Sequence, residues 1–398
     1  MDDPLFLARL QFALTAGSHF LFVALTLGLA TLVAIIQTRA TISRSPVHER
    51  MVRFWGQLYV INYAMGIVTG LLMEFQFGLA WGGLSRLTGD VFGAPIAMET
   101  LVAFFVESTF LGLWIFGWGR FGRWVHLAMI WVVTLTAYAS AFFILVANGF
   151  LKRPVGYEMR DGVARLTDAG ALLTNPAAVL AFWHVLFGAL VTAGVFMAGV
   201  SAYHLRRGTE EVEFFRRSLR IGMLALILSI SPTVVFGGAQ FPYRENSVPG
   251  VAEAPKSASA EAGLAVMTSM WGLLALLTVV CLVKFPFGRW LTRGRLFHLV
   301  LMAAIPLPYL AMLGGWVSRE MGRQPWAVVG VLRTEDALGP VGGPEMAASL
   351  TVFVTLFAVL IAINIWLLGR YGRRGPEGAV LGAPPPAPEP ARDLAPTF

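Results

Sequence analysis

Long apolar runs, separated by short segments rich in arginine, glycine and proline, are the main pattern of this chain. A helix that crosses a membrane needs about 20 predominantly apolar residues. Runs of this kind lie at 10–36, 55–80, 95–118, 124–150, 177–205, 219–238, 262–283, 296–316 and 347–369. The pattern therefore predicts an all-α fold, a polytopic membrane helix bundle of about nine transmembrane helices.

Proline marks two expected helix starts and the expected end of the folded part. Pro95 and Pro176 lie in the first turns of their spans, where the missing N–H has no partner in any helix. Beyond residue 374 the sequence has few apolar residues and a Pro-rich run at 384–390. Such a segment cannot bury enough apolar surface to fold. We therefore predict a transmembrane domain at 1–374 and a disordered cytoplasmic tail at 375–398.

Composition and charge add a topology to this picture. Hydrophobic residues make up 57% of the 398 positions and charged residues 13%, and the mean hydropathy is +0.69, which excludes an ordinary soluble protein. The net charge of +7 does not indicate nucleic-acid binding, because most of the 30 Lys and Arg residues follow the odd-numbered spans or lie in the tail. Cytoplasmic loops carry such an excess of cations. We predict a multi-pass protein of a bacterial or archaeal cell membrane, with the N-terminus outside and the C-terminus in the cytoplasm.

Candidate chemistry lies in a few polar residues within the apolar runs. His19 and His184 are the two of the six histidines that fall inside long runs, whereas the other four lie in or beside basic loops. Carboxylates and thioethers occupy other runs, at Glu74, Glu99, Glu107, Met267 and Met270. Together these groups are the ingredients of haem or metal ligation inside a bilayer. Cys281 is the single cysteine, which excludes a Cys-ligated iron–sulfur cluster and a CxxCH haem site.

The depth of each polar group in the membrane follows from the helical rise of about 1.5 Å per residue. With the N-terminus outside, one group of residues is expected in the outer half of the membrane: His19, Glu99, Ser140, His184, Met270 and Glu320. Glu107 lies deeper, about two helical turns from Glu99. The sequence thus predicts a cofactor layer near the outer surface and a proton path from the inside.

Each of these residues also has a purely structural interpretation. An intramembrane histidine can simply hydrogen-bond to a neighbouring helix, and Met267 and Met270 can fill gaps in the core. The carboxylates are harder to explain in this way, because a buried one must be protonated, paired, or next to a metal or a proton path. We expect Arg9 and Arg323 to anchor anionic groups near the outer interface, for which haem propionates are suitable.

Five sequence strings carry a resemblance to a known family. They are ALTAGSHFLFVALTLG around His19, GLLMEFQFG around Glu74, GAPIAMETLVAFFVEST around Glu99 and Glu107, ILVANGF after Ser140, and GRQPW at 322–326. In this order they resemble subunit I of cytochrome bd-type oxidases, membrane quinol oxidases that reduce dioxygen to water. The resemblance extends from Phe6 to Leu368, with a gap in one loop, and it implies that 1–374 is a haem-binding oxidase domain.

The resemblance also implies a set of haem ligands. His184 and Met270 match the axial pair of a low-spin haem b. His19 and Glu320 match the axial ligands of two high-spin haems, one b and one d, and which residue serves which haem stays open. A His/Met pair leaves no open coordination position and suits electron transfer, whereas a single protein ligand leaves one face for dioxygen.

Further roles follow from the same resemblance. Glu99 and Glu107 match acidic residues beside the high-spin haems, placed for ligation or proton delivery, and Ser140 matches a polar position on the proton route. Trp316 matches an aromatic residue near the high-spin pair. The resemblance also implies a second, homologous or paralogous subunit in the complex, so the expected partners are this subunit, quinol, dioxygen and the lipid membrane.

Two segments depart from the family pattern. The outer loop associated with the quinol site is shortened here to 238–260, although it retains polar residues, among them Tyr243, Arg244 and Glu253. The family usually has an arginine two residues before the ligand methionine, but this chain has Thr268 there. Loss of that charge should alter the haem potential or the pairing of its propionates. Met267, one turn earlier than Met270, leaves open which sulfur is the ligand.

Three functions remain after these departures. The first is a haem-bearing oxidase subunit that passes electrons from quinol to dioxygen. The alternatives are a bd-like subunit with a non-quinol donor and a haem-poor paralogue that serves as a structural partner. A transporter is less favoured, because the broken helix pairs typical of such folds are not obvious. The shortened loop predicts a shallow, open donor site.

Overall fold

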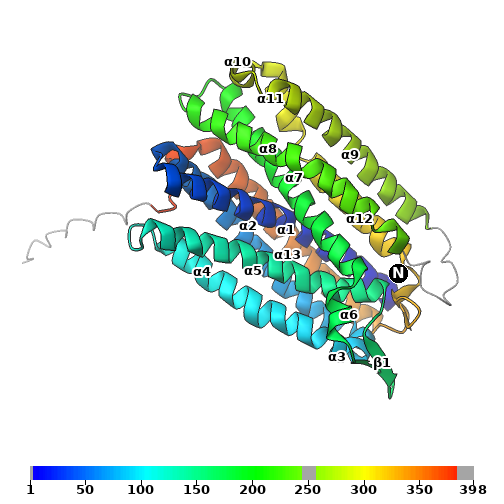
Figure 1. Ribbon diagram of the computed structural model, residues 1–398. Helices are drawn as coiled ribbons and strands as arrows, with labels where there is room; N and C mark the ends of the chain where they lie inside the picture. Colours follow the sequence, from blue (N-terminus) through cyan, green and yellow to red (C-terminus); the bar gives the residue numbers. More distant parts are fainter. Residues whose placement is uncertain (1–2, 244–256, 383–398) are drawn as a thin grey trace, which may run out of the picture.

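The computed structural model describes residues 3–243 and 257–382, which form a bundle of long helices lying roughly side by side (Figure 1). Within these residues, nine helical stretches are long and apolar enough to cross a membrane, which confirms the expected fold class. Five of them are single helices, α1 (Pro4–Ser43), α2 (Pro46–Leu79), α5 (Arg123–Lys152), α9 (Ala258–Lys284) and α13 (Gly343–Arg374). The third span consists of α3 (Gly82–Ala97), a π-helix (Met98–Phe104) and α4 (Phe105–Phe116), and the fifth of α6 (Ala169–Leu173) and α7 (Pro176–Arg206). The sixth consists of α8 (Val212–Gly238) and a 3-10 turn (Phe241–Tyr243), and the eighth of α11 (Arg295–Ala303) and α12 (Leu307–Gly322). The short α10 (Gly288–Arg293) precedes α11.

The third span differs from the sequence prediction at its start. Helix α3 begins at Gly82, so Pro95 lies inside it rather than in its first turn. The backbone changes to the π-helix three residues after this proline, and Glu99 is the second residue of that segment. Such π segments are rare and are frequent at functional sites. By contrast, α7 begins at Pro176 as predicted, and the preceding Asn175 caps it by accepting a hydrogen bond from the Ala177 N–H.

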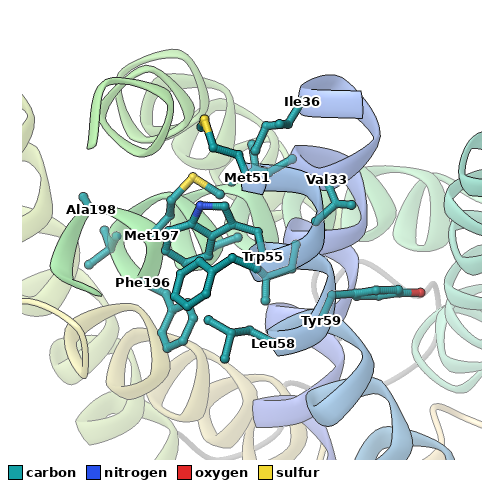
Figure 2. Packing of buried hydrophobic residues seen from close by; sticks show 14 of the residues in the cluster. Val33, Ile36, Met51, Trp55, Leu58, Tyr59, Phe196, Met197 and Ala198 are labelled. Carbon is teal, nitrogen blue, oxygen red and sulfur yellow. The ribbon is translucent and has the colours of Figure 1, made fainter. Parts of the chain in front are cut away.

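The largest core cluster joins α1, α2, α7 and α8. Figure 2 shows Trp55 of α2 packed among Leu58, Phe196 and Met197, and the Trp55 indole N–H donates to the Ser218 hydroxyl at 3.0 Å. The Tyr59 ring points away from this group (Figure 2). Tyr59 lies one turn after Trp55 on α2 and is buried in the same cluster, so the two rings extend from one helix into different parts of this core.

Glycine pairs allow two helix pairs to approach closely. A Cβ atom added to Gly194 of α7 would lie 2.7 Å from the carbonyl oxygen of Gly222 in α8. In the same way, a Cβ atom at Gly263 of α9 would lie 2.6 Å from the carbonyl oxygen of Gly314 in α12. Small residues at such crossings are typical of membrane helix pairs. They fix α8 on α7 and α12 on α9, the helices that carry the candidate ligands of the second half of the chain.

Two short hairpins, which the sequence did not predict, connect helices at the N-terminal end of the bundle (Figure 1). Strands β1 (Tyr157–Arg160) and β2 (Val163–Leu166) form one antiparallel pair, and β3 (Trp326–Val328) and β4 (Leu332–Arg333) form the other. Asp90 of α3 holds the first hairpin by accepting a hydrogen bond from the Leu166 N–H at 2.9 Å.

The chain beyond α13 packs on the bundle further than expected. The Val380 N–H donates to the Gln57 side chain at 2.6 Å, Arg53 donates to the Gly382 carbonyl oxygen at 2.5 Å, and Leu381 is buried in the main core cluster. The packed part therefore extends to residue 382 rather than ending at 374. The Pro-rich run at 384–390 lies outside the described residues, so its disorder stays a prediction. The described chain begins and ends at opposite ends of the bundle (Figure 1).

Candidate functional site

Helix α7 presents His184 to α8 through one ring nitrogen. Nδ1 lies 2.8 Å from the carbonyl oxygen of Thr233. A carbonyl oxygen only accepts hydrogen bonds, so Nδ1 carries the proton and Nε2 keeps its lone pair. No group of the described residues hydrogen-bonds to Nε2. A Cβ atom at Gly237 would lie 2.8 Å from Nδ1, so a glycine there leaves room for the ring. This is the form of histidine that binds a metal.

Helix α1 presents His19 to α2 in the same form. Nδ1 lies 2.9 Å from the hydroxyl of Thr69. That hydroxyl already donates its single proton toward the carbonyl oxygens of Met65 and Gly66, at 2.9 and 3.0 Å. It can therefore only accept from Nδ1, which leaves the lone pair on Nε2. Again, none of the described residues hydrogen-bonds to this Nε2.

The other four histidines have a different arrangement. They are buried residues of helices rather than of loops. In three of them Nε2 donates to a backbone carbonyl: His126 to Trp114 at 2.9 Å, His204 to Gly372 at 2.7 Å and His298 to Leu291 at 2.6 Å. The Nδ1 atom of the fourth, His48, is buried without a hydrogen bond to the described residues. Only His19 and His184 combine a donating Nδ1 with an Nε2 that no described residue occupies.

The two methionines of α9 differ in what their surroundings allow. A Cβ atom at Gly315 would lie 2.7 Å from the Met267 sulfur, so this sulfur packs against the backbone of α12. Met270 is half-buried and lies three residues further along α9. The contact with α12 gives Met267 the gap-filling role. It favours Met270 as the sulfur available to a cofactor.

Glu320 has its two carboxylate oxygens in different environments. Oε2 accepts from Arg323 at 2.7 and 2.8 Å, and both side chains are about nine-tenths buried. Oε1 accepts a long hydrogen bond from the Asn148 amide, at 3.5 Å. Arg323 also donates to the carbonyl oxygens of Trp326 and Ala327. It therefore fixes the carboxylate to β3 through Oε2.

Trp316 connects α12 to the turn of α1 that carries His19. Trp316 lies one turn before Glu320 on α12, and its ring meets Phe20 edge-on, with centroids 5.9 Å apart. A Cβ atom at Gly17 would lie 3.9 Å from the same indole. Trp316 thus contacts α1 on both sides of His19. The predicted aromatic residue is thus close to the α1 turn of one candidate ligand, and its role beside a haem stays a prediction.

Glu99 lies in a polar cluster that spans three helices. The Ser140 hydroxyl of α5 donates to Glu99 Oε1 at 2.7 Å. The Thr100 hydroxyl lies 3.2 Å from Glu99 Oε2 and 3.2 Å from Glu74 Oε1 of α2. Hydroxyl groups between two carboxylates can pass a proton by rotating. Glu99 and Ser140, predicted from sequence, are thus in direct contact, and Thr100 adds Glu74 to them.

Glu107 is separate from this cluster and is buried on α4, with 5% of its surface exposed. It lies near the hydroxyls of Tyr59 and Tyr63 of α2. Both hydroxyl oxygens are buried and hydrogen-bond to none of the described residues. Buried polar groups in this condition point to a partner that the chain itself does not supply, such as ordered water. Glu107 and the two tyrosines therefore form a second polar group, separate from the Glu99 cluster.

Sequence reasoning missed Arg319, which connects three helices. Its guanidinium donates to the side-chain Oδ1 of Asn148 in α5 at 2.8 and 3.0 Å and to the Gln240 side chain after α8 at 2.8 Å. Its charge acts on both His184 and Glu320. An arginine directly before a ligand candidate in an apolar helix was the available signal. The predicted anchor Arg9 makes no hydrogen bond or ion pair with the described residues and stays a candidate for an anionic partner.

The donor segment is only partly described. Arg244 and Glu253 lie outside the described residues, and Tyr243 ends the first described stretch, with the Arg153 guanidinium 5.2 Å from its ring. Thr268 is exposed, and its hydroxyl donates to backbone carbonyls of α9 itself. Among the described residues no three His, Cys, Asp or Glu side chains gather into a site for a bare metal ion. The donor atoms are instead presented singly, as a haem requires.

Comparison with known proteins identifies the family. Residues 7–243 and 243–376 match the family described as cytochrome bd terminal oxidase subunit I. The chain belongs to this family. It is 34% identical to the cytochrome bd ubiquinol oxidase subunit 1 of Bacillus subtilis (strain 168), over 444 aligned residues that cover 94% of this chain and 95% of the relative.

Two further relatives support this assignment. The cytochrome bd-II ubiquinol oxidase subunit 1 of Escherichia coli (strain K12) is 30% identical over 509 aligned residues, with 95% of this chain and 98% of the relative covered. The solved bd oxidase structure from Geobacillus thermodenitrificans superposes with a TM-score of 0.82 at 25% identity, covering 94% of this chain and 99% of that one. The family match divides at residue 243, where the sequence has the shortened loop.

Proposed function

We propose that this chain is the haem-bearing subunit of a cytochrome bd-type terminal oxidase that passes electrons from quinol to dioxygen and reduces it to water. The observation that carries the proposal is the shared form of His19 and His184. Each donates Nδ1–H to the neighbouring helix and keeps Nε2 for a metal. A structural histidine has no need to leave one nitrogen open inside a membrane, and the other four histidines do not show this combination.

Four residues are the proposed protein ligands of three haems. His184 and Met270 hold a low-spin haem b, and His19 and Glu320 each hold one of two high-spin haems, a b and a d. These groups supply electron transfer and dioxygen chemistry. The protein keeps Glu320 in place through Arg323, which binds Oε2. Arg9 and Arg323 are the proposed partners of haem propionates, and the Arg319 charge acts on one ligand from each kind of site.

The proton path runs through two carboxylates at different depths. Glu107, with the unpartnered hydroxyls of Tyr59 and Tyr63, lies nearer the cytoplasm, and Glu99 with Ser140 lies nearer the haems. Protons pass from the cytoplasmic side toward the haems through these groups. The hydroxyls alternate between donating and accepting hydrogen bonds as this happens. Glu107→Gln should slow oxygen consumption and leave the low-spin haem spectrum unchanged. Parental turnover in that variant would contradict the path.

The donor site is a shallow and open quinol site at the outer edge. The loop at 238–260 is too short for a folded cover, and the alignment with the E. coli relative is 509 residues long although this chain has 398. Tyr243, Arg244 and Glu253 provide aromatic, cationic and acidic groups for it. We expect weak quinol affinity and a poor response to quinol-site inhibitors. Arg319 connects this edge to the haem ligands through Gln240.

A second membrane subunit completes the complex. The third span, Gly82–Phe116, carries Glu99 and Glu107, but only 12% of its apolar window is buried within the chain. A homologous or paralogous subunit that covers this span would bury its exposed apolar face and shield the half-buried Glu99 from lipid. The orientation follows the distribution of Lys and Arg, with the N-terminus outside and residues 375–398 in the cytoplasm.

A spectrum and an assay of the purified complex test the proposal. A reduced-minus-oxidised spectrum, with haem extraction, should show two haems b and one haem d per complex. Oxygen consumption should proceed with quinol and not with reduced soluble carriers. Absence of haem from the chain would instead support the haem-poor partner, and turnover only with a soluble carrier would support the non-quinol donor.

A further inference from the structure

Thr69 differs from a threonine that only packs in a helix, because its hydroxyl forms hydrogen bonds to two helices. It is fully buried in α2, at 0% exposure. Its hydroxyl proton is directed at the carbonyl oxygens one turn earlier in its own helix, Met65 and Gly66. The hydroxyl lone pairs are thereby fixed toward α1, where His19 Nδ1 lies 2.9 Å away. The backbone of α2 thus orients an acceptor that belongs to a side chain.

The next residue, Gly70, sets the distance at which the imidazole can lie. A Cβ atom there would be 3.2 Å from His19 Cε1 and 3.8 Å from Nε2. The first value is tighter than an ordinary van der Waals contact, so a larger residue at this position would require the imidazole to shift. The two adjacent residues therefore act on one ring, Thr69 by hydrogen bonding and Gly70 by leaving space.

We propose that Thr69 and Gly70 are positioning residues that fix the tautomer and orientation of His19 and so tune the high-spin haem that His19 holds. The inference rests on the proposed function, since it assumes that His19 is a haem ligand. A hydrogen bond from Nδ1–H to an acceptor makes the opposite nitrogen more basic and a better iron ligand. A more basic ligand stabilises ferric over ferrous iron. Thr69 therefore keeps the midpoint potential of this haem lower than an unsupported histidine would.

The test compares Thr69→Val, which keeps the shape and removes the acceptor, with Thr69→Ser, which keeps the hydroxyl. Thr88→Val is the matched control, because Thr88 is also fully buried and its hydroxyl bonds only to its own helix, at Leu84. In the detergent-solubilised complex, anaerobic redox titration and the ratio of haem to protein are measured for each variant. The low-spin haem in the same sample is an internal standard, because its histidine donates to a backbone carbonyl.

Thr69→Val should raise the midpoint potential of the high-spin haem and weaken haem retention by about 10- to 100-fold, with the low-spin haem unchanged. Thr69→Ser and Thr88→Val should both resemble the parent. If Thr69→Val matches Thr88→Val in potential and in retention, the inference is overturned. If Thr69→Val does not assemble, Gly70→Ala decides, since we expect it to release the high-spin haem selectively, and parental retention would overturn the proposal.

His19→Ala separates this inference from the function on which it rests. Loss of a high-spin haem in His19→Ala, combined with an unchanged Thr69→Val, would reject only the positioning role. Full retention of all haems in His19→Ala would reject the ligand assignment itself. The potential and the haem ratio are read without turnover, so neither result depends on activity.

Discussion

The His19 and His184 sites share one design but use different kinds of acceptor. In both, Nδ1 donates to an adjacent helix and a glycine of that helix leaves room for the ring. His19 donates to a side-chain hydroxyl, whereas His184 donates to the backbone carbonyl of Thr233. A carbonyl is present whatever the residue, so the His184 arrangement depends on helix position alone. The His19 arrangement depends on the residue at position 69 and is open to adjustment by mutation.

The surroundings of the two histidines differ in charge as well. Near His19, α12 contributes the aromatic Trp316 and then the carboxylate Glu320, which is paired with Arg323. Near His184, the proposed second ligand is the neutral thioether of Met270. A rigid, neutral pair suits electron transfer with little reorganisation, while a site with a carboxylate and nearby proton donors suits the consumption of protons. Under the proposed ligand assignment, the two sites thus divide electron supply from dioxygen chemistry.

The largest effect should come from removing either imidazole. His184→Ala should abolish the low-spin haem b spectrum, and His19→Ala should abolish a high-spin component, with oxygen consumption at background in both. Optical difference spectra of the two purified variants, recorded with the parent, check this. If one variant loses both components equally, the two sites are not independent and the comparison fails.

Replacement of the sulfur ligands should have the next largest effect, confined to one site. Met270→Leu should convert the low-spin haem into a high-spin form, because it keeps the volume and removes the thioether. Met267→Leu should retain the low-spin spectrum, since its sulfur packs on Gly315, and should cost less than about 1.5 kcal/mol in stability. The reverse result would transfer the ligand role to Met267.

Adding a methyl group to each glycine sharpens the comparison. An alanine in a helix is favoured over glycine by about 1 kcal/mol, but over-packing costs about 1–3 kcal/mol. At Gly237 the new Cβ would lie 2.8 Å from the His184 ring, and at Gly70 it would lie 3.2 Å from the His19 ring. Gly237→Ala should therefore lower the thermal unfolding temperature more than Gly70→Ala. Equal unfolding temperatures would mean that α8 adjusts to the added methyl group as easily as α2 does.

The smallest effect is expected at a histidine outside the comparison. His204 stacks on Phe215, with centroids 4.0 Å apart, and donates Nε2–H to Gly372. His204→Gln keeps a donor and should lose about 1 kcal/mol of stability with no haem lost. Haem analysis and thermal unfolding provide the check. Loss of any haem in this variant would show that the position of the ring proton does not distinguish ligands from structural histidines.

The sequence predicted the spans and most site residues because membrane burial leaves a strong trace. Apolar runs located the nine stretches within the described residues, and ionisable groups inside them were few enough to single out. The contact between Glu99 and Ser140 agrees with their similar predicted depth. Depth depends only on counting residues along a helix, which a sequence permits.

Lateral relationships could not be predicted in the same way. Thr69, Thr233 and Arg319 act across helix pairs, and a single sequence does not reveal which helix faces which. Thr69 has no ionisable group to draw attention, and the acceptor at Thr233 is a carbonyl that every residue carries. The start of the third span at Gly82 was missed because Pro95 lies inside the helix, where proline is normally disfavoured.

The π-helix at Met98–Phe104 gives the third span one more residue than its α-helical neighbours need. Deletion of one residue there would restore a continuous α-helix and leave the residues after it facing nearly the same way, because the π-helix already absorbs the extra residue. Glu107 would then keep its orientation, whereas the wide turn that carries Glu99 would be lost, although the length and hydropathy of the span would barely change. A single-codon deletion in the gene would thus alter the backbone around Glu99 and not that around Glu107, without altering the membrane topology. Comparison of homologous genes at this segment should accordingly count codons between Pro95 and Glu107 rather than score their apolar character.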